Sequence, residues 1–589
     1  MKKLLAITLA LMFCLSLLGG CGGSNSPNND VSSAQATTAS SQTTQTSASS
    51  STSSAQTVEE SAPEPIEFLI VNPATGVDWE LAGTPVGDLF VERTGVNFVC
   101  QNSIGDQNEV IALMLASDDL PDIVQGSAGL PMFIEAGKAL EITELAETYA
   151  PNLTDIYKYD DFWQRFYYSK EDKGRYYLPH FRNIPADVFE VGGWLYLQHD
   201  VVIDQGYPEM KYLEQFENAI ESYVKKYPTI DGQPTIGMTL MCGDSWNLFL
   251  TNPSIYVSGV ESAAEWVADR ETHEITYHTV LYGEIREYFR WLNGMYNKGL
   301  LDKEAFTQTF DEYKAKIATG RVLSISGPGW TFAYDAAVTL RNEGKEERLY
   351  GAYPIALKEG VKNSTLGQSR AYPSYAINGS FVTTACKDPE RLFEFINYWV
   401  TEEAQILRNW GIEGVHYDIV DGKRVFKQEE RDKKATDPDY GLKTGIGCIF
   451  ALPNYENGQK DSSGQYITLS SKDDVIANYS DTDKKVLSAY GAEIWPDLFP
   501  QGTEFELRPW PLEHTVMRLP ADSDGAIAFA RCQDVVVKDV VAAVVAAPGA
   551  FDAAWDTFIA DMDDAGQGVY VNELTAFIKD LMEVWGMTF

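Results

Sequence analysis

The chain has 589 residues, which is too many for one small core and enough for two or more lobes. It carries 85 Asp and Glu residues against 46 Lys and Arg, and this balance disfavours nucleic-acid binding, which needs a basic surface. Five cysteines beyond the N-terminal region are scattered without a CxxC pair, so we expect small buried residues rather than disulfides or a metal site: Cys100, Cys242, Cys386, Cys448 and Cys532.

Residues 1–20 have the pattern of a signal peptide. Two lysines precede a mostly apolar run, Leu4 to Leu18, of about 15 residues, which is too short to span a bilayer permanently. The run ends in Leu-Gly-Gly-Cys, and small residues there suit cleavage. This ending resembles a bacterial lipobox, which implies that Cys21 becomes a lipidated N-terminus; the alternative is a plain secretory signal with an incidental cysteine.

Residues 21–63 join this anchor to the rest of the chain. From Ser24 to about Ala62 the chain is mostly Ser, Thr, Ala, Gln and Asn. This composition buries too little surface to offset the entropy of ordering, so we expect a flexible tether. Beyond it, no second apolar stretch approaches transmembrane length.

The mature domain then opens with alternating strands and helices, as expected for an α/β lobe. The run Ile66–Val71 predicts a buried strand. Thr84 and Pro85 begin a helix with Val86, Leu89 and Phe90 on its inner face, and Gly95 ends it. Next come a strand at Val96–Cys100, a helix at Gln107–Ser117 with Val110, Leu113 and Met114 on one side, and a strand at Leu120–Val124.

A similar alternation follows later in the chain. We expect an amphipathic helix at Gly283–Asn297, a long helix at Asp388–Leu407, and two helices between Ala553 and Met587 joined near Gly566. The expected strands are Thr235–Leu240, Arg321–Ser326 (broken by Gly327-Pro328-Gly329) and Tyr375–Thr384, and a further helix begins at Trp246–Leu250.

No catalytic motif stands out from this pattern. His273 and His278 are one residue too far apart for the zinc-protease helix motif, and the residues between them favour a strand. A glycoside hydrolase, which needs two carboxylates in a cleft, stays open as an alternative because the chain has many acids. A peptide-binding protein built from similar α/β lobes is a second alternative that stays open.

Several segments together resemble the family 1 extracellular solute-binding lipoproteins of bacterial ABC sugar importers. They are Leu115–Val124, Tyr288–Asp302, Cys386–Arg391, Trp410–Tyr417 with Asp421-Gly422-Lys423, and Trp555–Phe558. The resemblance implies a periplasmic-binding-protein type II fold, with two α/β lobes, a hinge and an interlobe cleft. It implies a monomeric protein that is not an enzyme and has no cofactor. The protein would be anchored by lipid at the outer face of the cell membrane of a Gram-positive organism. There it would deliver a carbohydrate to permease subunits. The resemblance places the first lobe at about 64–190 plus 370–440 and the second at about 191–369 plus 441–589.

The chain departs from the family in two places. Where many relatives carry a calcium-loop-like stretch, the sequence Tyr227–Pro234 has too few carboxylates for a calcium site, so we expect no metal. The segment Leu197–Val202 lacks the Arg and Trp common there in relatives, which favours a different sugar.

The expected ligand-binding residues follow strands, because ligands of open α/β sheets sit beyond the carboxyl ends of strands. Aromatic rings cover the apolar faces of a sugar, and amide or acid side chains bind its hydroxyl edges. The segment from Glu413 to His416 either contacts the ligand or fixes a turn. The candidates are Asn72, Gln125, Trp194, Asp244, Trp246, Trp330, Tyr372, Tyr375, Trp410, Glu413 and His416.

Overall fold

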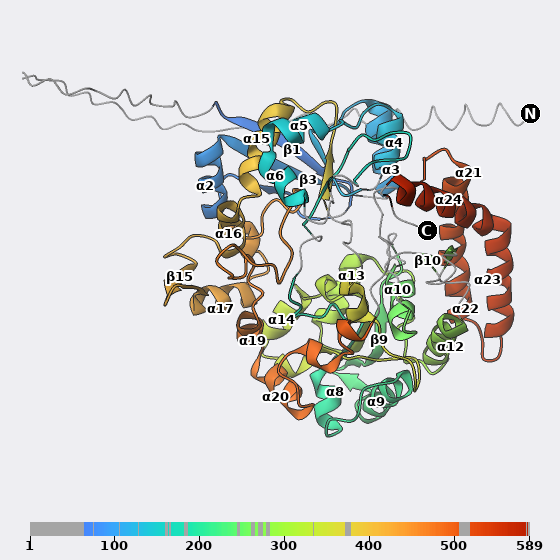
Figure 1. Ribbon diagram of the computed structural model, residues 1–589. Coiled ribbons are helices and arrows are strands. Elements are labelled where there is room, and N and C mark those ends of the chain that lie inside the picture. Colours follow the sequence, from blue (N-terminus) through green and yellow to red (C-terminus); the bar gives the residue numbers. More distant parts are fainter. Residues whose placement is uncertain are drawn as a thin grey trace, which may run out of the picture. The chain divides into compact units, whose positions relative to one another are not determined.

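The structure, a computed structural model, describes most of the chain beyond residue 63. The described residues are 64–74, 76–104, 107–127, 129–158, 163, 166–181, 186–243, 248–260, 266–268, 275–277, 283–333, 335–370, 379–505, 519–584 and 586. Two β-sheets, each packed in its own buried core and surrounded by helices, organise the described fold (Figure 1).

The first sheet has six strands in the order β2-β3-β1-β4-β14-β5. Strand β1 runs parallel to β3 and β4, whereas β14 is antiparallel to β4. The expected strands near residues 66, 96 and 120 are therefore confirmed. The bounds are β1 Ile66–Asn72, β2 Trp79–Glu80, β3 Val96–Asn102, β4 Ile123–Gln125, β5 Leu178–Pro179 and β14 Gly379–Val382.

Helix α2, Pro85–Thr94, begins and ends as its sequence predicts. The Thr84 hydroxyl accepts a hydrogen bond from the Gly87 amide at 3.0 Å, and Gly95 ends the helix at φ 69°, a conformation that glycine adopts without strain. The other helices around this sheet are α3 Gln107–Ser117, α4 Leu130–Glu135, α5 Thr143–Tyr149, α6 Pro151–Tyr157, α15 Pro389–Trp399 and α16 Glu402–Trp410.

Two details of these helices differ from expectation. In α3, Met114 is buried and Val110 packs against the core as expected, but Leu113 is 68% exposed and Ile111, which was not expected, is fully buried. The long helix expected at Asp388–Leu407 is two helices, because the Thr401 hydroxyl accepts a hydrogen bond from the Ala404 amide and starts α16 anew.

The chain after α16 forms a small subdomain beside the first core. The β15–β16 hairpin turns at Asp421 and Gly422, which both have positive φ. Its elements are β15 Tyr417–Val420, β16 Lys423–Phe426, α17 Gln428–Thr436, α18 Tyr440–Thr444 and α19 Lys472–Asn478.

The second sheet has four strands in the order β13-β6-β12-β9. Strands β9 and β12 are parallel, and β6 is antiparallel to both β12 and β13. The bounds are β6 Leu195–Gln198, β9 Ile236–Leu240, β12 Val322–Ser326 and β13 Tyr350–Ala352.

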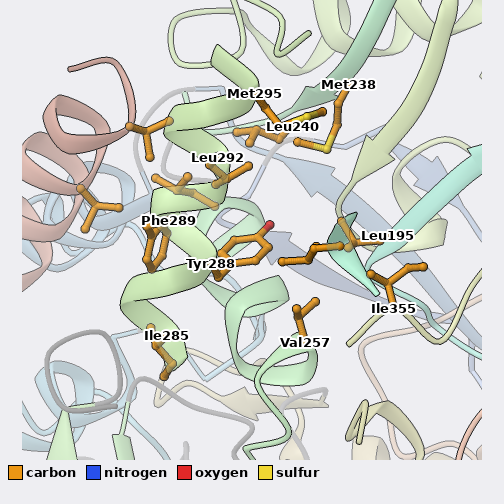
Figure 2. Packing of buried hydrophobic residues seen from close by; sticks show 14 of the residues in the cluster. Leu195, Met238, Leu240, Val257, Ile285, Tyr288, Phe289, Leu292, Met295 and Ile355 are labelled. Atoms are coloured by element: carbon orange, nitrogen blue, oxygen red, sulfur yellow. The ribbon is translucent and has the colours of Figure 1, made fainter. Parts of the chain in front are cut away.

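Helix α12, Gly283–Asn297, packs its apolar side on this sheet. Figure 2 shows Tyr288 and Leu292 of α12 beside Leu195 of β6 and Leu240 of β9. All five apolar residues expected on this side are fully buried, so this prediction is confirmed: Ile285, Tyr288, Phe289, Leu292 and Met295.

Further helices pack around the second sheet, some of them through separate smaller clusters. Helices α23 and α24 are joined at Gly566, as expected, and join the second core through Trp555 and Phe558. The helices are α8 His199–Asp204, α9 Leu213–Lys226, α10 Leu248–Val257, α13 Phe310–Ala318, α14 Ala336–Asn342, α20 Asp481–Ala489, α21 Asp524–Val535, α22 Val541–Val544, α23 Phe551–Ala565 and α24 Gln567–Val584. Short hairpins are β7 Thr229–Ile230 with β8 Gln233–Pro234, and β10 Trp266–Ala268 with β11 Ile275–Tyr277.

The chain passes between the two cores three times. The first core holds residues from Phe68 to Phe181 and from Phe381 to Leu452, and the second holds residues from Leu195 to Ile355 and from Val486 to Met582. Ile446, Ile449, Ala451 and Leu452 belong to the first core, a few residues beyond the approximate boundary at 441, and the lobe boundaries stay a prediction. The two interleaved α/β lobes have the periplasmic-binding-protein type II architecture.

The cysteines have the surroundings expected of small core residues. Each of the five described cysteines is a free thiol, and four of them are buried; Cys448 is half-buried. Burial raises the pKa of Cys100 and Cys386 to about 12, so these thiols stay protonated near neutral pH.

Candidate functional site

Three amide side chains stand at the carboxyl edge of the first sheet. The register pairs Asn72 of β1 with Asn102 of β3, and Val71 with Val124, so that Gln125 follows on the neighbouring strand. The Asn72 amide nitrogen donates to the Asn102 side-chain oxygen at 2.8 Å. Asn102 was missed because the expected strand ended at residue 100; its pairing with Asn72 follows only from the register.

Two tryptophans stand at the corresponding edge of the second sheet. Strand β6 is antiparallel to β12, so Trp194, just before β6, meets Gly327, just after β12: the Gly327 amide donates to the Trp194 carbonyl at 2.9 Å. Trp330 follows in the short 3-10 turn Gly329–Thr331 and is 50% exposed.

Neighbouring rings hold these two indoles. The ring of Trp194 stacks on that of Tyr256 at 5.3 Å and 13°. Phe249 of α10 meets the Trp330 ring edge-on at 6.0 Å. A half-exposed indole at the edge where ligands of such sheets bind is a candidate surface for the apolar face of a ligand.

Glu190 lies close in sequence to this tryptophan edge. Glu190, on the segment that leads from the first core to β6, accepts a hydrogen bond from the Asn457 side chain at 3.2 Å. Glu190 and Lys434 of α17 both retain exposed surface, yet desolvation raises the pKa of Glu190 and lowers the pKa of Lys434.

The segment Trp410–Tyr417 forms a braced turn. His416 is 3% exposed, and its Nδ1 accepts a hydrogen bond from the Ile412 amide at 2.9 Å. Glu413 pairs with Tyr417 through an isolated bridge, and Trp410 donates from Nε1 to the Tyr466 carbonyl at 3.2 Å. Burial lowers the pKa of His416, which keeps the ring a neutral acceptor. The turn-fixing alternative accounts for these contacts, and a role in ligand binding stays a prediction.

Trp410 also borders a cavity of about 920 Å³ between the β15–β16 hairpin, α17 and α19. Both arginines in its wall have acidic partners: Arg424 is 2.6 Å from Asp461, and Arg431 is ion-paired with Asp474. These pairs tie the hairpin and α17 to the segment that returns to the second core.

Five expected residues lie outside the described residues: Cys21, Asp244, Trp246, Tyr372 and Tyr375. Their roles stay predictions.

The stretch that is calcium-loop-like in relatives is here the β7–β8 hairpin. Its one carboxylate, Asp231, is 2.9 Å from Arg348 and 3.1 Å from Lys345. Both cations contact Oδ2 of Asp231 and lower its pKa. Within the described residues no group of three His, Cys, Asp or Glu side chains could hold a metal ion.

None of the helices in the described ranges combines the length and the apolar character needed to cross a membrane.

Comparison with known proteins gives matches in structure alone, since neither a protein-family model nor a curated protein sequence matches the chain. The alginate-binding protein AlgQ2 without calcium ion is similar with a TM-score of 0.59 at 14% identity, over 87% of this chain and 98% of that one.

Two further solved structures are similar over nearly the same span. An HMO-binding, ABC-transporter-associated solute-binding protein from Bifidobacterium longum infantis gives a TM-score of 0.59 at 14% identity, over 89% of this chain and 100% of that one. The S. pneumoniae ABC-transporter substrate-binding protein FusA in complex with kestose gives 0.60 at 15%, over 88% and 100%. At this identity the likeness establishes the fold, the two-lobed architecture expected from the sequence.

Proposed function

We propose that this chain is the extracytoplasmic substrate-binding protein of an ABC importer, and that it captures a carbohydrate, with an oligosaccharide favoured, for delivery to membrane permease subunits. The fold it shares with solute-binding proteins supports this proposal. The structures it resembles include proteins named as alginate-binding and HMO-binding and one in complex with kestose.

The half-exposed indole of Trp330 is the observation that carries the carbohydrate assignment. It stands with Trp194 at the carboxyl edge of β12, where a flat ring can cover the C–H face of a sugar. At the edge of the first sheet, the side-chain amides of Asn72, Asn102 and Gln125 supply hydrogen-bonding groups for the hydroxyls of a sugar. A binding protein of this architecture uses both edges when its lobes close around a ligand.

The anchor and partners belong to the same proposal. Residues 1–20 direct export, Cys21 carries the lipid, and the tether to residue 63 lets a monomeric binding domain reach the permease from the outer face of the membrane, in a Gram-positive cell. Mass spectrometry of the N-terminal peptide tests the lipid directly: an acylated Cys21 is expected, and a peptide that begins elsewhere without lipid contradicts the anchor.

The surroundings of the carboxyl groups favour binding without turnover over glycoside hydrolysis. A retaining or inverting hydrolase places two carboxyl groups on either side of the scissile bond and raises the pKa of one. Among the described residues, the pKa is raised at Glu190 and Asp200. Asp200 lies in α8 against Tyr223 and Arg348, and Glu190 has Lys434 as its charged neighbour, so the two do not form such a pair.

Titration calorimetry with neutral and acidic oligosaccharides, followed by chromatography of the sugar, tests the proposal. We expect saturable binding with the sugar recovered unchanged, and a dissociation constant about tenfold or more higher for Trp330→Ala. Tyr227→Ala, which removes a 37% exposed ring at the end of α9, is the matched control and should bind normally. Release of shorter sugars would support the hydrolase, and binding of peptides alone would support the peptide-binding protein.

A further inference from the structure

An aromatic ring is exposed beyond the carboxyl edge of the first sheet. Strand β5 runs parallel to β4, because both strands are antiparallel to β14. The register places Leu178 of β5 in line with Gln125 of β4, so His180 lies beyond the edge, on the side where ligands of such sheets bind. The Phe450 ring meets the His180 ring edge-on at 5.0 Å, and Phe450 is 49% exposed. This phenyl ring therefore stands on the ligand side of the first sheet.

Two of the three passages to the second core begin beside this ring. Phe181 is the last residue of the first core before the chain reaches Leu195 in the second. Leu452 ends the later segment of the first core, and the Asn454 carbonyl just after it accepts a hydrogen bond from the Phe181 amide at 3.0 Å. The passages thus start side by side, next to the residues that hold Phe450.

The backbone directly before Phe450 is strained. Ile449 has a φ of 49° and is buried, although the left-handed conformation is unfavourable for a β-branched residue. Side chains on both flanks hold it there: Arg408 donates from Nε to the Cys448 carbonyl at 2.8 Å, and His180 donates from Nε2 to the Phe450 carbonyl at 2.9 Å. Strain of this kind persists only where the surroundings enforce it, and it clusters at ligand-binding sites.

The ring complements the amide side chains at the same edge. Asn72 and Asn102 can bond the hydroxyls of a sugar, whereas the phenyl ring of Phe450 offers an apolar surface for its C–H face. In the order β1-β4-β14-β5, the strands of Asn72 and Leu178 are three spacings apart, which is about 14 Å. A ligand that reaches from the amides to the ring is therefore longer than one sugar unit.

We propose that Phe450 contacts the ligand by covering the C–H face of one sugar unit, at the opposite end of the first sheet's edge from the Asn72–Asn102 pair, and that the ligand is an oligosaccharide of several units. The proposal rests on the proposed function and adds a binding residue and a ligand length to it. Trp330 then serves the same ligand from the second lobe.

A glycan array first identifies an oligosaccharide series that binds, and calorimetry then compares its members from the monosaccharide to the hexasaccharide. We expect the affinity of the wild type to rise with length. Phe450→Leu, which keeps an apolar side chain against His180 but loses the flat ring, should weaken binding of the longest members about three- to tenfold. Phe450→Trp keeps a flat ring and should retain the affinity.

Two measurements separate ligand contact from a structural role. Phe450→Leu should melt at the temperature of the wild type, so that its lower affinity reports the lost ring. Leu442→Ala, which truncates a 42% exposed apolar residue on α18, is the matched control and should bind normally.

The outcomes distinguish this inference from the proposed function. If Trp330→Ala weakens binding but Phe450→Leu binds the longest members as the wild type does, Phe450 lies outside the site and the inference is wrong, while carbohydrate capture stands. A monosaccharide bound as tightly as the hexasaccharide overturns the ligand length. If no glycan binds the wild type, the proposed function fails and this inference fails with it.

Discussion

Asp200, in helix α8, is a carboxyl group whose surroundings oppose its ionisation. Desolvation by burial, together with the charge of Glu347, raises the pKa of Asp200 to about 6. The compensating contacts are weak: Tyr223 donates at 3.5 Å, and the Arg348 guanidinium is 3.8 Å away, with 24% of the Asp200 side chain exposed. Against an ordinary pKa of about 4, and at about 1.4 kcal/mol per pH unit, ionised Asp200 costs the folded state at most about 3 kcal/mol.

The direction of the pH dependence follows from this pKa. Because the folded-state pKa lies above the unfolded one, the folded protein holds an extra proton between about pH 4 and pH 6. The stability that this proton contributes is present below pH 4 and is lost as the pH rises through about 6. We therefore predict that Asp200→Asn raises the free energy of unfolding by about 2 kcal/mol at pH 7.5, and hardly at all at pH 4.

The assay must resolve the two lobes, because they need not unfold together. Calorimetric melting between pH 4 and pH 8, with hydrogen exchange of the α8 amides, locates the effect in the second core. Asp204→Asn, on the same helix, is the control: Asp204 is 2.6 Å from Lys226 at the surface, its pKa is lowered, and its loss should cost less than about 1 kcal/mol. A destabilised Asp200→Asn protein at pH 7.5 would refute the reasoning.

Two further substitutions test the packing of the fold. Lys316→Met should destabilise the second core by about 3–5 kcal/mol in denaturant titrations, because it leaves the buried carboxylate of Asp302, 2.6 Å from the Lys316 ammonium, without its cation. The surface variant Lys345→Met should cost less than about 1 kcal/mol, and equal losses would contradict the argument. Gly458→Ala should lower the melting temperature far more than Gly464→Ala: both glycines have positive φ, but a Cβ at Gly458 would stand 1.8 Å from the Asp187 carbonyl oxygen, whereas Gly464 has open space.

Local signals in the sequence predicted the fold well. The Thr84 cap, Pro85 and Gly95 define both ends of α2 without any tertiary contact, because capping is decided within one turn of helix. The spacing of apolar residues in α12 predicted its buried side equally well, because the other side of the helix is polar. The ends of α2 and the buried side of α12 are both decided by residues near in sequence, and both predictions are confirmed.

Predictions failed where partners distant in the chain decide the structure. Helix α3 is apolar on most sides, so its sequence did not show that Ile111 would face inward; contact with Gly129 decides this, since a Cβ there would meet Ile111 at 2.6 Å. The candidate site divides in the same way. Trp330 could be chosen because it follows a strand, whereas Asn102 depends on strand register, which the sequence does not show.

The three passages between the cores bear on how the nascent chain folds. Strand β14 lies between β4 and β5 in the first sheet, yet about two hundred residues separate it from β5 in the sequence, and the second core includes Met582. Neither core can be completed until the ribosome has released the later segments. Folding therefore depends on pairing between segments distant in the sequence, and we expect it to be slow. A fragment that stops before Gly379 would expose the edges of β4 and β5, and we expect it to aggregate rather than form half of the protein.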